Sequence, residues 1–486
     1  MSLLAILPLI ACAVVIIIAQ RSALVGACIG IVTALLLISV SDSFSLSIAN
    51  ATIAGLDTLI LTLSAAIVIV PGLYFNAILR EHGTVTAIQK WFEQLPYCRE
   101  HKTLLLLFGL LPAVESLTGF GVSLFLSIPI LFHLFVGPIA FRLSMLGMNI
   151  MPWGTLGLAT VVGAHLSGVA THTLGWFSAL TSSLVFPVLS LVALYVMDGL
   201  QSVKNYYRAA MGLSAGLSVM LLLFNHFQLV EIAGVLAGLM VCLAGALVLP
   251  KEGMTVLQTD RPRQTLGAFL PYGGVLLIVA FERVVPGLYT FLGNALVLTG
   301  STVSLKVFTS PGIALLAVSV LFYLSRPISL PHKVVFTRAR TTCMSLLIFI
   351  ALAQIMRQSG MVGMFAAGLA QWNGDVLLLC SPLVGMVSGF ITGSNLSGNA
   401  LTMSVQSSLG SQLGLVESFT AAQNSGAGHA VFSSIPIIVM ILTLAKDLAP
   451  QTSIAPTTQE HHLLKFGLSV AILILVALTV MAWIIH

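Results

Sequence analysis

Charged residues are scarce in this sequence. Of its 486 residues only 7% are charged, 20 Lys and Arg against 15 Asp and Glu, whereas 58% are apolar. A soluble domain carries about a quarter charged residues, so this chain cannot solvate the surface of a soluble globular protein. The alternation of apolar and polar residues that marks a membrane β-strand is also missing. These two absences exclude a soluble protein and a membrane β-barrel.

Motifs for metal, phosphate or nucleic-acid chemistry are missing as well. The six cysteines are scattered without metal or disulfide spacing, and we interpret them as small buried apolar residues. No ATP-site or Gly-rich phosphate motif occurs, so we expect no cofactor, no metal and no ATP-driven pumping. The net charge of +5 lies in short loops, where it concerns membrane orientation rather than nucleic acid.

Long apolar runs dominate the chain. Runs of about 18 residues or more with few charges are typical of transmembrane helices. The first run has no basic residue before Arg21, so we interpret it as a span and not as a cleaved signal. We predict an all-α polytopic membrane protein with about 12 spans, near residues 3–20, 22–40, 55–79, 143–163, 168–197, 209–224, 228–248, 265–281, 311–325, 341–356, 419–446 and 466–485.

Two further apolar stretches, 103–133 and 376–413, are interrupted by Gly, Ser and Thr. We expect each to be a re-entrant hairpin that enters and leaves the bilayer on one side. With that assumption, the basic segments all fall on one side of the membrane, which the positive-inside rule makes the cytoplasmic side. Both termini then lie outside, and we expect a multi-pass protein of the bacterial inner membrane. The basic segments are 80–102, 204–208, 251–263 and 326–340.

Two parts of the chain carry the same motifs in the same order. Asn76-Ala-Ile-Leu-Arg80-Glu-His-Gly83 corresponds to Ala353-Gln-Ile-Met-Arg357-Gln-Ser-Gly360. Arg80 ends its span inside and Arg357 ends its span outside, so we expect inverted repeats of the kind that build many secondary transporters. The later pairs are Trp91 with Trp372, Thr118-Gly119 with Thr392-Gly393, and Asn149 with Asn424, at offsets of 274 to 281 residues.

The repeat divides the chain into five expected parts. Two of them are the inverted repeats, each with one hairpin and one short interfacial helix, at 84–96 and at 361–372. The five parts are N-terminal helices 1–54, a first repeat 55–197, connecting helices 198–340, a second repeat 341–446 and a C-terminal helix 447–486.

The first hairpin contains a carboxyl group next to a glycine-rich break. Glu115 precedes Gly119-Phe120-Gly121, where the chain can leave the helix. A carboxyl group at membrane depth is rare without a partner or a function, and the N–H groups of the second half-helix suit an anion. Two interpretations stay open: Glu115 carries a proton during transport, or it caps backbone N–H groups of the hairpin. Asp57, near the outer start of its span, is expected to cap that span.

The second hairpin is rich in amides and hydroxyls and has no charge at its break. Unsatisfied backbone at membrane depth is tolerated only where it is buried in protein or lines a watery cavity. We therefore favour a ligand site here over a small-residue packing face.

The span that follows each hairpin is also expected to be broken, at 149–157 after the first hairpin and at 423–429 after the second. The candidate substrate-binding residues are Ser116, Thr118, Gly119, Phe120, Gly121, Asn149, Thr392, Gly393, Ser394, Asn395, Ser397, Asn399, Asn424, Ser425 and His429.

At these hairpins the sequence resembles the L-lactate permease family, which includes glycolate permeases. Glu115 followed by Gly119-Phe120-Gly121 is similar to that family's first hairpin. The spans after the two hairpins are similar too, at Asn149, Pro152, Gly154 and Gly157, and at Ala421-Ala422 with Ser425-Gly426. The run from Thr392 to Leu401 is similar to the family's second hairpin. The resemblance implies a proton-coupled importer of small 2-hydroxy monocarboxylates.

Two positions depart from the family pattern. The acid of the second hairpin is Asn395 here, and a lysine of the next span is missing, with His429 as the nearest basic residue. An acid and a base lost together are typical of a removed charge pair, so we place the chain as a divergent member.

We therefore expect a secondary active symporter for a small organic anion in the lipid bilayer, with substrate between the two hairpin tips. The alternatives are Na⁺ coupling, a channel, or an intramembrane hydrolase that uses Ser394 or Ser425 with His429. A hydrolase lacks support because neither Ser394 nor Ser425 lies in a Gly-x-Ser-x-Gly elbow, and we expect no enzyme. No oligomeric state follows from the sequence.

Overall fold

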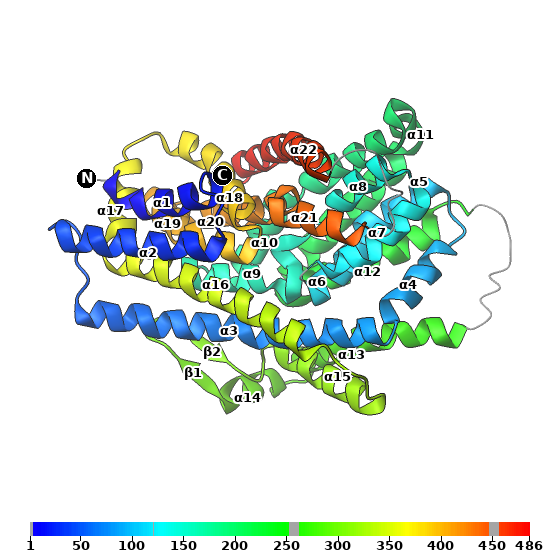
Figure 1. Cartoon of the computed structure of the whole chain (residues 1–486), viewed down its shortest axis with the longest axis horizontal. Coiled ribbons are helices and arrows are strands. Elements are labelled where there is room, and N and C mark those ends of the chain that lie inside the picture. Colours follow the sequence, from blue (N-terminus) through cyan, green and yellow to red (C-terminus); the bar gives the residue numbers. More distant parts are fainter. Residues whose placement is uncertain (1–2, 120, 252–261, 447–455) are drawn as a thin grey trace.

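The structure is a computed structural model that describes residues 3–119, 121–251, 262–446 and 456–486. Almost all of these residues are helical, and most long helices run side by side along one direction (Figure 1). The all-α fold predicted from the apolar runs is confirmed.

The first half of the described chain forms η1 (Leu4–Ile6), α1 (Leu7–Ile17), α2 (Ala23–Val40), α3 (Ile48–Glu81), α4 (Thr84–Glu93), α5 (Arg99–Leu105), a π-helical turn η2 (Leu106–Leu110), α6 (Leu111–Thr118), α7 (Val122–Leu134), α8 (Gly137–Leu146), η3 (Met151–Trp153), α9 (Gly154–Ser167), α10 (Thr171–Ser182), α11 (Val185–His226) and α12 (Val230–Val248). The second half forms α13 (Pro262–Val284), α14 (Leu288–Ala295), β1 (Val297–Thr299), β2 (Ser304–Lys306), α15 (Pro311–Ser325), α16 (His332–Gln358), α17 (Met361–Leu369), α18 (Gly374–Thr392), α19 (Asn395–Leu413), α20 (Val416–Ala430), η4 (Val431–Ser433), α21 (Ile435–Leu444) and α22 (Pro456–Ile484).

The described residues contain nine helices long and apolar enough to span a membrane. The count is ten when α8 and η3–α9, which meet at a 53° bend, are taken as one span. Both counts include Gly374–Thr392, which lies in the second expected hairpin. The expected number of about 12 spans is higher for two reasons. The helices at Leu4–Ile17 and Pro311–Ser325 are shorter than a full span, and α11 contains parts of two predicted spans.

Helix α11 folds back on itself, which explains its length of 42 residues. Asp198 and Gly199 have non-helical backbone angles in its middle. On either side of this break, Ser214 Oγ donates to Ser190 Oγ at 3.2 Å and Ser218 Oγ donates to the Ser183 carbonyl at 2.7 Å. The two arms of α11 therefore pack antiparallel.

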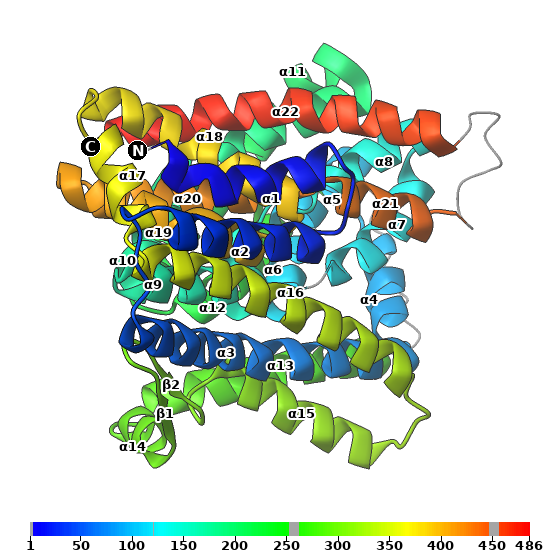
Figure 2. The same cartoon turned by 60° about the vertical axis from the view of Figure 1, so that its left-hand side comes forward.

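The motifs that repeat in the sequence adopt matching conformations. Gly83 ends α3 with φ of 68°, and Gly360 ends α16 with φ of 83°, values that suit glycine because it has no Cβ. Each glycine leads into a short helix, α4 or α17, where interfacial helices were predicted. These two helices lie at opposite ends of the bundle (Figures 1 and 2). This placement is compatible with inverted repeats, and the inversion itself stays a prediction.

The placement of the chain ends and basic segments is compatible with the expected topology. The chain begins and ends at the same end of the bundle, whereas α4 and the α15–α16 connection lie at the other end (Figures 1 and 2). Of the basic segment 251–263, residues 252–261 lie outside the described residues. Which end faces the cytoplasm stays a prediction.

One expected break is wrong. Residues 423–429 are continuous helix within α20, and the chain leaves the helix only at Val431–Ser434, before α21. The glycines of this stretch serve close packing instead. A Cβ at Gly426 would lie 2.5 Å from the Pro382 carbonyl oxygen, and one at Gly428 would lie 2.6 Å from the Pro152 ring. Small residues let helix backbones approach closely in a membrane protein.

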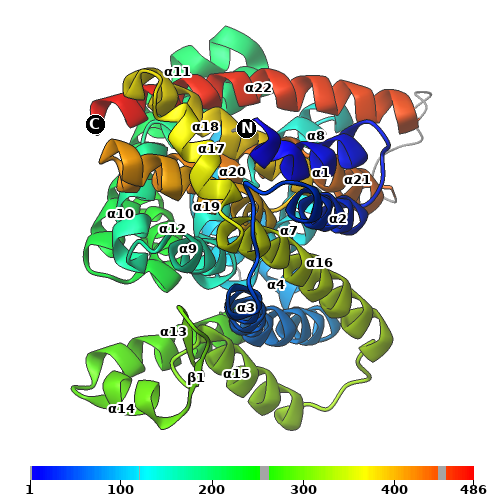
Figure 3. The same ribbon diagram turned by 90° about the vertical axis from the view of Figure 1, so that its left-hand side faces the viewer.

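Helices α13 to α15 and the two short strands form a layer on one side of α3 (Figure 3). Asp57 of α3 fastens this layer. Its buried carboxylate accepts hydrogen bonds from the Ser301 N–H at 2.6 Å, the Thr302 N–H at 3.0 Å and the Thr302 hydroxyl at 2.6 Å. The prediction that Asp57 caps its own helix is wrong, because α3 begins further back, with Ser47 as its cap.

We expect Asp57→Asn to loosen the β1–β2 turn. Hydrogen bonds to a charged group contribute about 1.5–3 kcal/mol each, so the neutral amide should raise the open population of the turn about tenfold. Limited proteolysis of detergent-purified protein, with cleavage sites mapped by mass spectrometry, measures this as faster cutting between residues 296 and 307. Asp42→Asn, at an exposed carboxylate of the α2–α3 connection, is the matched control. Equal cutting rates in all three proteins contradict the fastening role.

Candidate functional site

The first hairpin turns at two glycines with left-handed backbone. Gly119 has φ of 66° and Gly121 has φ of 74°, a conformation that residues with a Cβ rarely adopt. They separate α6 from α7, as the glycine-rich motif predicted. Gly119 also lies directly against Thr155, where no Cβ fits. Phe120, a predicted site residue between the two glycines, lies outside the described residues.

Glu115 caps the second half of this hairpin. Its Oε1 accepts from the Gly121 N–H at 3.0 Å, and its Oε2 accepts from the Ser123 N–H at 3.1 Å and the Ser123 hydroxyl at 2.7 Å. The side chain is 1% exposed. The capping interpretation is therefore confirmed as geometry, and proton carriage by the same carboxyl group stays a prediction.

Among the described residues at the start of α7, Gly121 to Leu124, every backbone N–H group is paired in this state. Glu115 binds the N–H groups of Gly121 and Ser123. The next two are also paired, Val122 N–H with the Gly119 carbonyl and Leu124 N–H with the Gly121 carbonyl. The protein's own carboxylate occupies these N–H groups in this state, and the expectation that they receive a substrate anion stays a prediction.

The second hairpin is closed by neutral groups. Gly393 has φ of 66°, and the Ser394 hydroxyl accepts from the Ser397 N–H at 3.4 Å to cap α19. The Thr392 hydroxyl donates to the Ser388 carbonyl of its own helix at 2.8 Å. Residues 392–394 are half-buried, whereas the described residues 111–119 of the first hairpin are buried.

Both hairpin tips contact the same face of α21. Gly121 lies against the Met440 methyl group, and a Cβ at Gly393 would lie 2.8 Å from the Pro436 ring. Pro436 and Met440 are four residues apart, which places them one helical turn apart on one face. The structure thus brings the two glycine-rich tips close together, although they are about 270 residues apart in sequence.

A left-handed break in the first turn of α9 links the first tip to the centre of the protein. Thr155, Leu156 and Gly157 have φ of 53°, 56° and 65°. Non-glycine residues in this region each cost about 1–3 kcal/mol and are typical of functional sites. The Thr160 hydroxyl closes the break by donating to the Pro152 carbonyl at 2.6 Å. The break predicted at 149–157 is therefore present.

Asn424 of α20 is the hub of a buried polar network. Its Nδ2 donates to the Thr160 hydroxyl at 2.8 Å and the Ser178 hydroxyl at 2.9 Å. Its Oδ1 accepts from Asn399 Nδ2 at 2.8 Å and from Asn395 Nδ2 at 3.4 Å. All four hydrogen-bonding positions of the amide are used. The structure brings the candidate residues Asn395, Asn399 and Asn424 together, and their role in substrate binding stays a prediction.

This network has more acceptors than donors. We call Asn395, Asn399, Gln423 and Asn424 the amide cluster. Three of its buried side-chain oxygens have no donor among the described residues: Asn395 Oδ1, Asn399 Oδ1 and Gln423 Oε1. An unpaired buried acceptor costs about 1–3 kcal/mol. The amide cluster is therefore suited to a ligand that brings hydroxyl protons or positive charge.

A chain of hydroxyls leads from the network to His429. His429 Nε2 lies 2.9 Å from the Ser182 Oγ, Ser182 donates to the Ser425 Oγ at 3.1 Å, and Ser425 donates to the Ser178 carbonyl at 3.2 Å. His429 Nε2 contacts Ser182 and not Ser425. Ser425 therefore lacks the base that a serine nucleophile requires, and Ser394 is engaged as a helix cap.

Several predicted residues have structural contacts instead of facing the amide cluster. The Thr118 hydroxyl donates to the Val114 carbonyl of its own helix at 2.6 Å, and Asn149 Nδ2 donates to the Leu146 carbonyl at 3.0 Å. Ser116 lies against Gly234 of α12. Ser397 contributes its N–H to the cap of α19.

Sequence reasoning missed three hydroxyl partners of the network: Thr160, Ser178 and Ser182. They lie within apolar runs, where single hydroxyls are also common at packing faces. The spacing of Ser178 and Ser182, four residues apart on one face of α10, is the one signal that pointed to a polar stripe there.

Comparisons with known proteins agree over nearly the whole chain. The sequence profile of the L-lactate permease family matches residues 1–266 and 265–486. An L-lactate permease from Streptococcus iniae is 21% identical over 405 residues, which cover 78% of this chain and 85% of the relative. An L-lactate permease from Salmonella typhimurium is 23% identical over 428 residues, with 76% and 77% covered.

We expect Asn424→Ala to destabilise the protein, because it leaves the Thr160 and Ser178 hydroxyls and the Asn399 amide without their shared partner. The loss should be about 1–3 kcal/mol, seen as a lower midpoint of thermal unfolding by tryptophan fluorescence in detergent. Asn424→Asp keeps the acceptor and removes the donors, so it should fall between Asn424→Ala and the unmodified protein. Asn205→Ala, at an exposed position of α11, is the control. A midpoint for Asn424→Ala equal to that of the control argues against a hub.

Proposed function

Because the chain belongs to the L-lactate permease family, we propose that it is a proton-coupled secondary transporter that imports a small 2-hydroxy monocarboxylate such as L-lactate or glycolate. The curated relatives are permeases and not enzymes. The apolar helices make the chain a multi-pass membrane protein. The buried carboxyl group of Glu115 at the first helix break is the observation that carries the proton-coupling proposal.

Protonation of Glu115 is proposed to make room for the substrate. Ionised Glu115 occupies the Gly121 and Ser123 N–H groups, and α7 has no other free donor at this end. A protonated carboxyl group is a weaker acceptor than a carboxylate, so protonation releases these N–H groups to the carboxylate of the substrate. Proton uptake and anion binding then depend on each other, as symport requires.

The amide cluster is proposed to bind the hydroxyl end of the substrate. Its unpaired oxygens accept hydrogen bonds, and a 2-hydroxy acid has one hydroxyl donor beside its carboxylate. The contacts of both hairpin tips with α21 support a site between the tips. A site built to bind a substrate hydroxyl discriminates strongly against an analogue that lacks it.

The orientation is proposed from the charges. The basic segments are proposed to face the cytoplasm, and both termini to face the outside of a bacterial inner membrane. The two hairpins would then enter from opposite sides, within inverted repeats that place the substrate near the midplane.

Glu115→Gln tests the coupling directly. Glutamine cannot release a proton, so we expect no pH-driven accumulation of labelled L-lactate in proteoliposomes. Counterflow exchange, which needs no net proton movement, should remain measurable. Glu81→Gln, at an exposed carboxyl group at the end of α3, is the matched control and should accumulate lactate normally. Normal pH-driven accumulation by Glu115→Gln would overturn the assignment of Glu115 as the coupling group.

Na⁺ coupling is a second candidate, favoured by the same unpaired oxygens. Amide and hydroxyl oxygens are ligands for hard cations, and Asn395, Asn399 and Gln423 each present an unpaired oxygen near the second hairpin. Asn395 and Asn399 are one helical turn apart on α19.

Uptake in Na⁺-free buffer separates the two candidates. For proton coupling we expect lactate uptake under an inward proton gradient to be unchanged when choline replaces Na⁺. A drop of about tenfold or more, together with accumulation driven by a Na⁺ gradient at equal pH, supports Na⁺ coupling instead. Glu115→Gln should then respond to Na⁺ as the unmodified protein does.

A further inference from the structure

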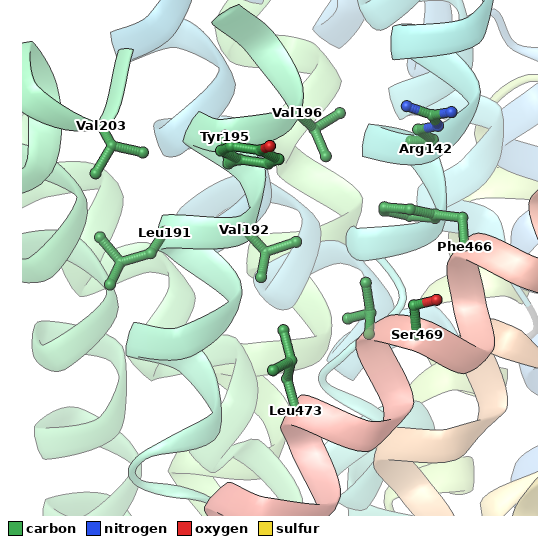
Figure 4. A pocket seen from close by; sticks show the side chains of 10 residues that line it. Arg142, Leu191, Val192, Tyr195, Val196, Val203, Phe466, Ser469 and Leu473 are labelled. Carbon is green, nitrogen blue, oxygen red and sulfur yellow. The ribbon is translucent and has the colours of Figure 1, made fainter. Parts of the chain in front are cut away.

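A pocket unrelated to the hairpins lies between α8, α11 and α22. Its volume is about 530 Å³, and most of its wall is apolar, with Leu191 and Tyr195 of α11 facing Phe466 and Leu473 of α22 (Figure 4). Tyr195 is 60% exposed and Leu473 is 46% exposed. In a membrane protein such exposed apolar residues face lipid, so the pocket opens towards the acyl chains of the bilayer.

A single cation lies at one end of this pocket. Arg142 of α8 places its guanidinium 5.5 Å from the centre of the Phe466 ring. Among the described residues no carboxylate forms an ion pair with it. Arg142 is exposed, so its charge is open to a ligand at this end of the pocket, beside the Phe466 ring.

The surrounding charges favour an anion here. Exposed Lys204 and Lys465 adjoin the lining residues Val203 and Phe466 in the chain. Asp198, three residues after Tyr195, and Glu460, five residues before Lys465, are the acids near these positions in the chain. Helix α8 lies at the same end of the bundle as α4 (Figures 1 and 2). Helix α4 carries part of the basic segment 80–102. Basic pockets between transmembrane helices at the cytoplasmic side suit anionic lipid headgroups.

We propose that this pocket binds one anionic phospholipid, with its phosphate at Arg142 and an acyl chain along the apolar wall of α11 and α22. The planar guanidinium matches a phosphate group with two parallel hydrogen bonds. The apolar groove matches the acyl chain, and the charge of Arg142 favours a headgroup with net negative charge. This site is independent of the transport proposal.

Native mass spectrometry of the purified full chain tests the proposal. Phosphatidylglycerol, phosphatidylcholine and inorganic phosphate are each added to delipidated protein. We expect one phosphatidylglycerol to bind about tenfold more tightly than phosphatidylcholine, and inorganic phosphate alone not to bind. Arg142→Gln should remove this preference, whereas Arg338→Gln, an exposed arginine of α16, should retain it.

A second variant separates loss of the site from loss of the fold. Leu473→Trp fills the groove and keeps Arg142, so it should weaken phosphatidylglycerol binding without lowering the unfolding midpoint. The proposal is overturned if Arg142→Gln, folded as judged by that midpoint, binds phosphatidylglycerol as tightly as the unmodified protein. It is also overturned if the unmodified protein does not distinguish the two lipids.

Discussion

A chain inside a bilayer has to satisfy every backbone N–H and C=O group from within the protein, and a broken helix leaves such groups unpaired at each break. The first hairpin of this protein meets the requirement with a charged side chain: Glu115 binds the N–H groups of Gly121 and Ser123. The second hairpin meets it with a neutral one, the hydroxyl of Ser394. The same backbone problem therefore has one solution that depends on protonation and one that does not.

This difference connects the proposed chemistry to the architecture. Protonation at Glu115 changes how well α7 is capped, whereas the cap of α19 is the same in acid and base. Between the two tips, the strained first turn of α9 and the Asn424 network form a continuous set of contacts through Thr155 and Thr160. Connected elements of this kind can couple two binding sites energetically when the elements themselves can adopt two alternative arrangements.

The sequence predicted the all-α fold, the positions of both helix breaks and the two short helices after Gly83 and Gly360. These features follow from local rules, because glycine clusters and apolar runs act over a few residues. The break expected at 423–429 was wrong because Gly426 and Gly428 serve close packing, which depends on neighbours distant in sequence. The partners Thr160, Ser178 and Ser182 were missed for the same reason. Of the two interpretations of Glu115, proton carriage and capping of its own hairpin, the capping contact likewise depends on how the hairpin folds.

The two hairpins also differ in what a movement would break. The bonds of Glu115 run to residues six and eight positions further along the same hairpin, so the hairpin keeps them when it shifts as a whole. The second hairpin is tied to another helix, since Asn399 donates to the Ala159 carbonyl and Ser407 to the Ser167 carbonyl of α9. The first hairpin also has ties outside itself: Asn76 of α3 donates to the Thr118 carbonyl at 3.4 Å, and the Ser123 hydroxyl donates to Met148 Sδ at 3.2 Å. A movement of the second hairpin relative to α9 breaks its hydrogen bonds to the Ala159 and Ser167 carbonyls.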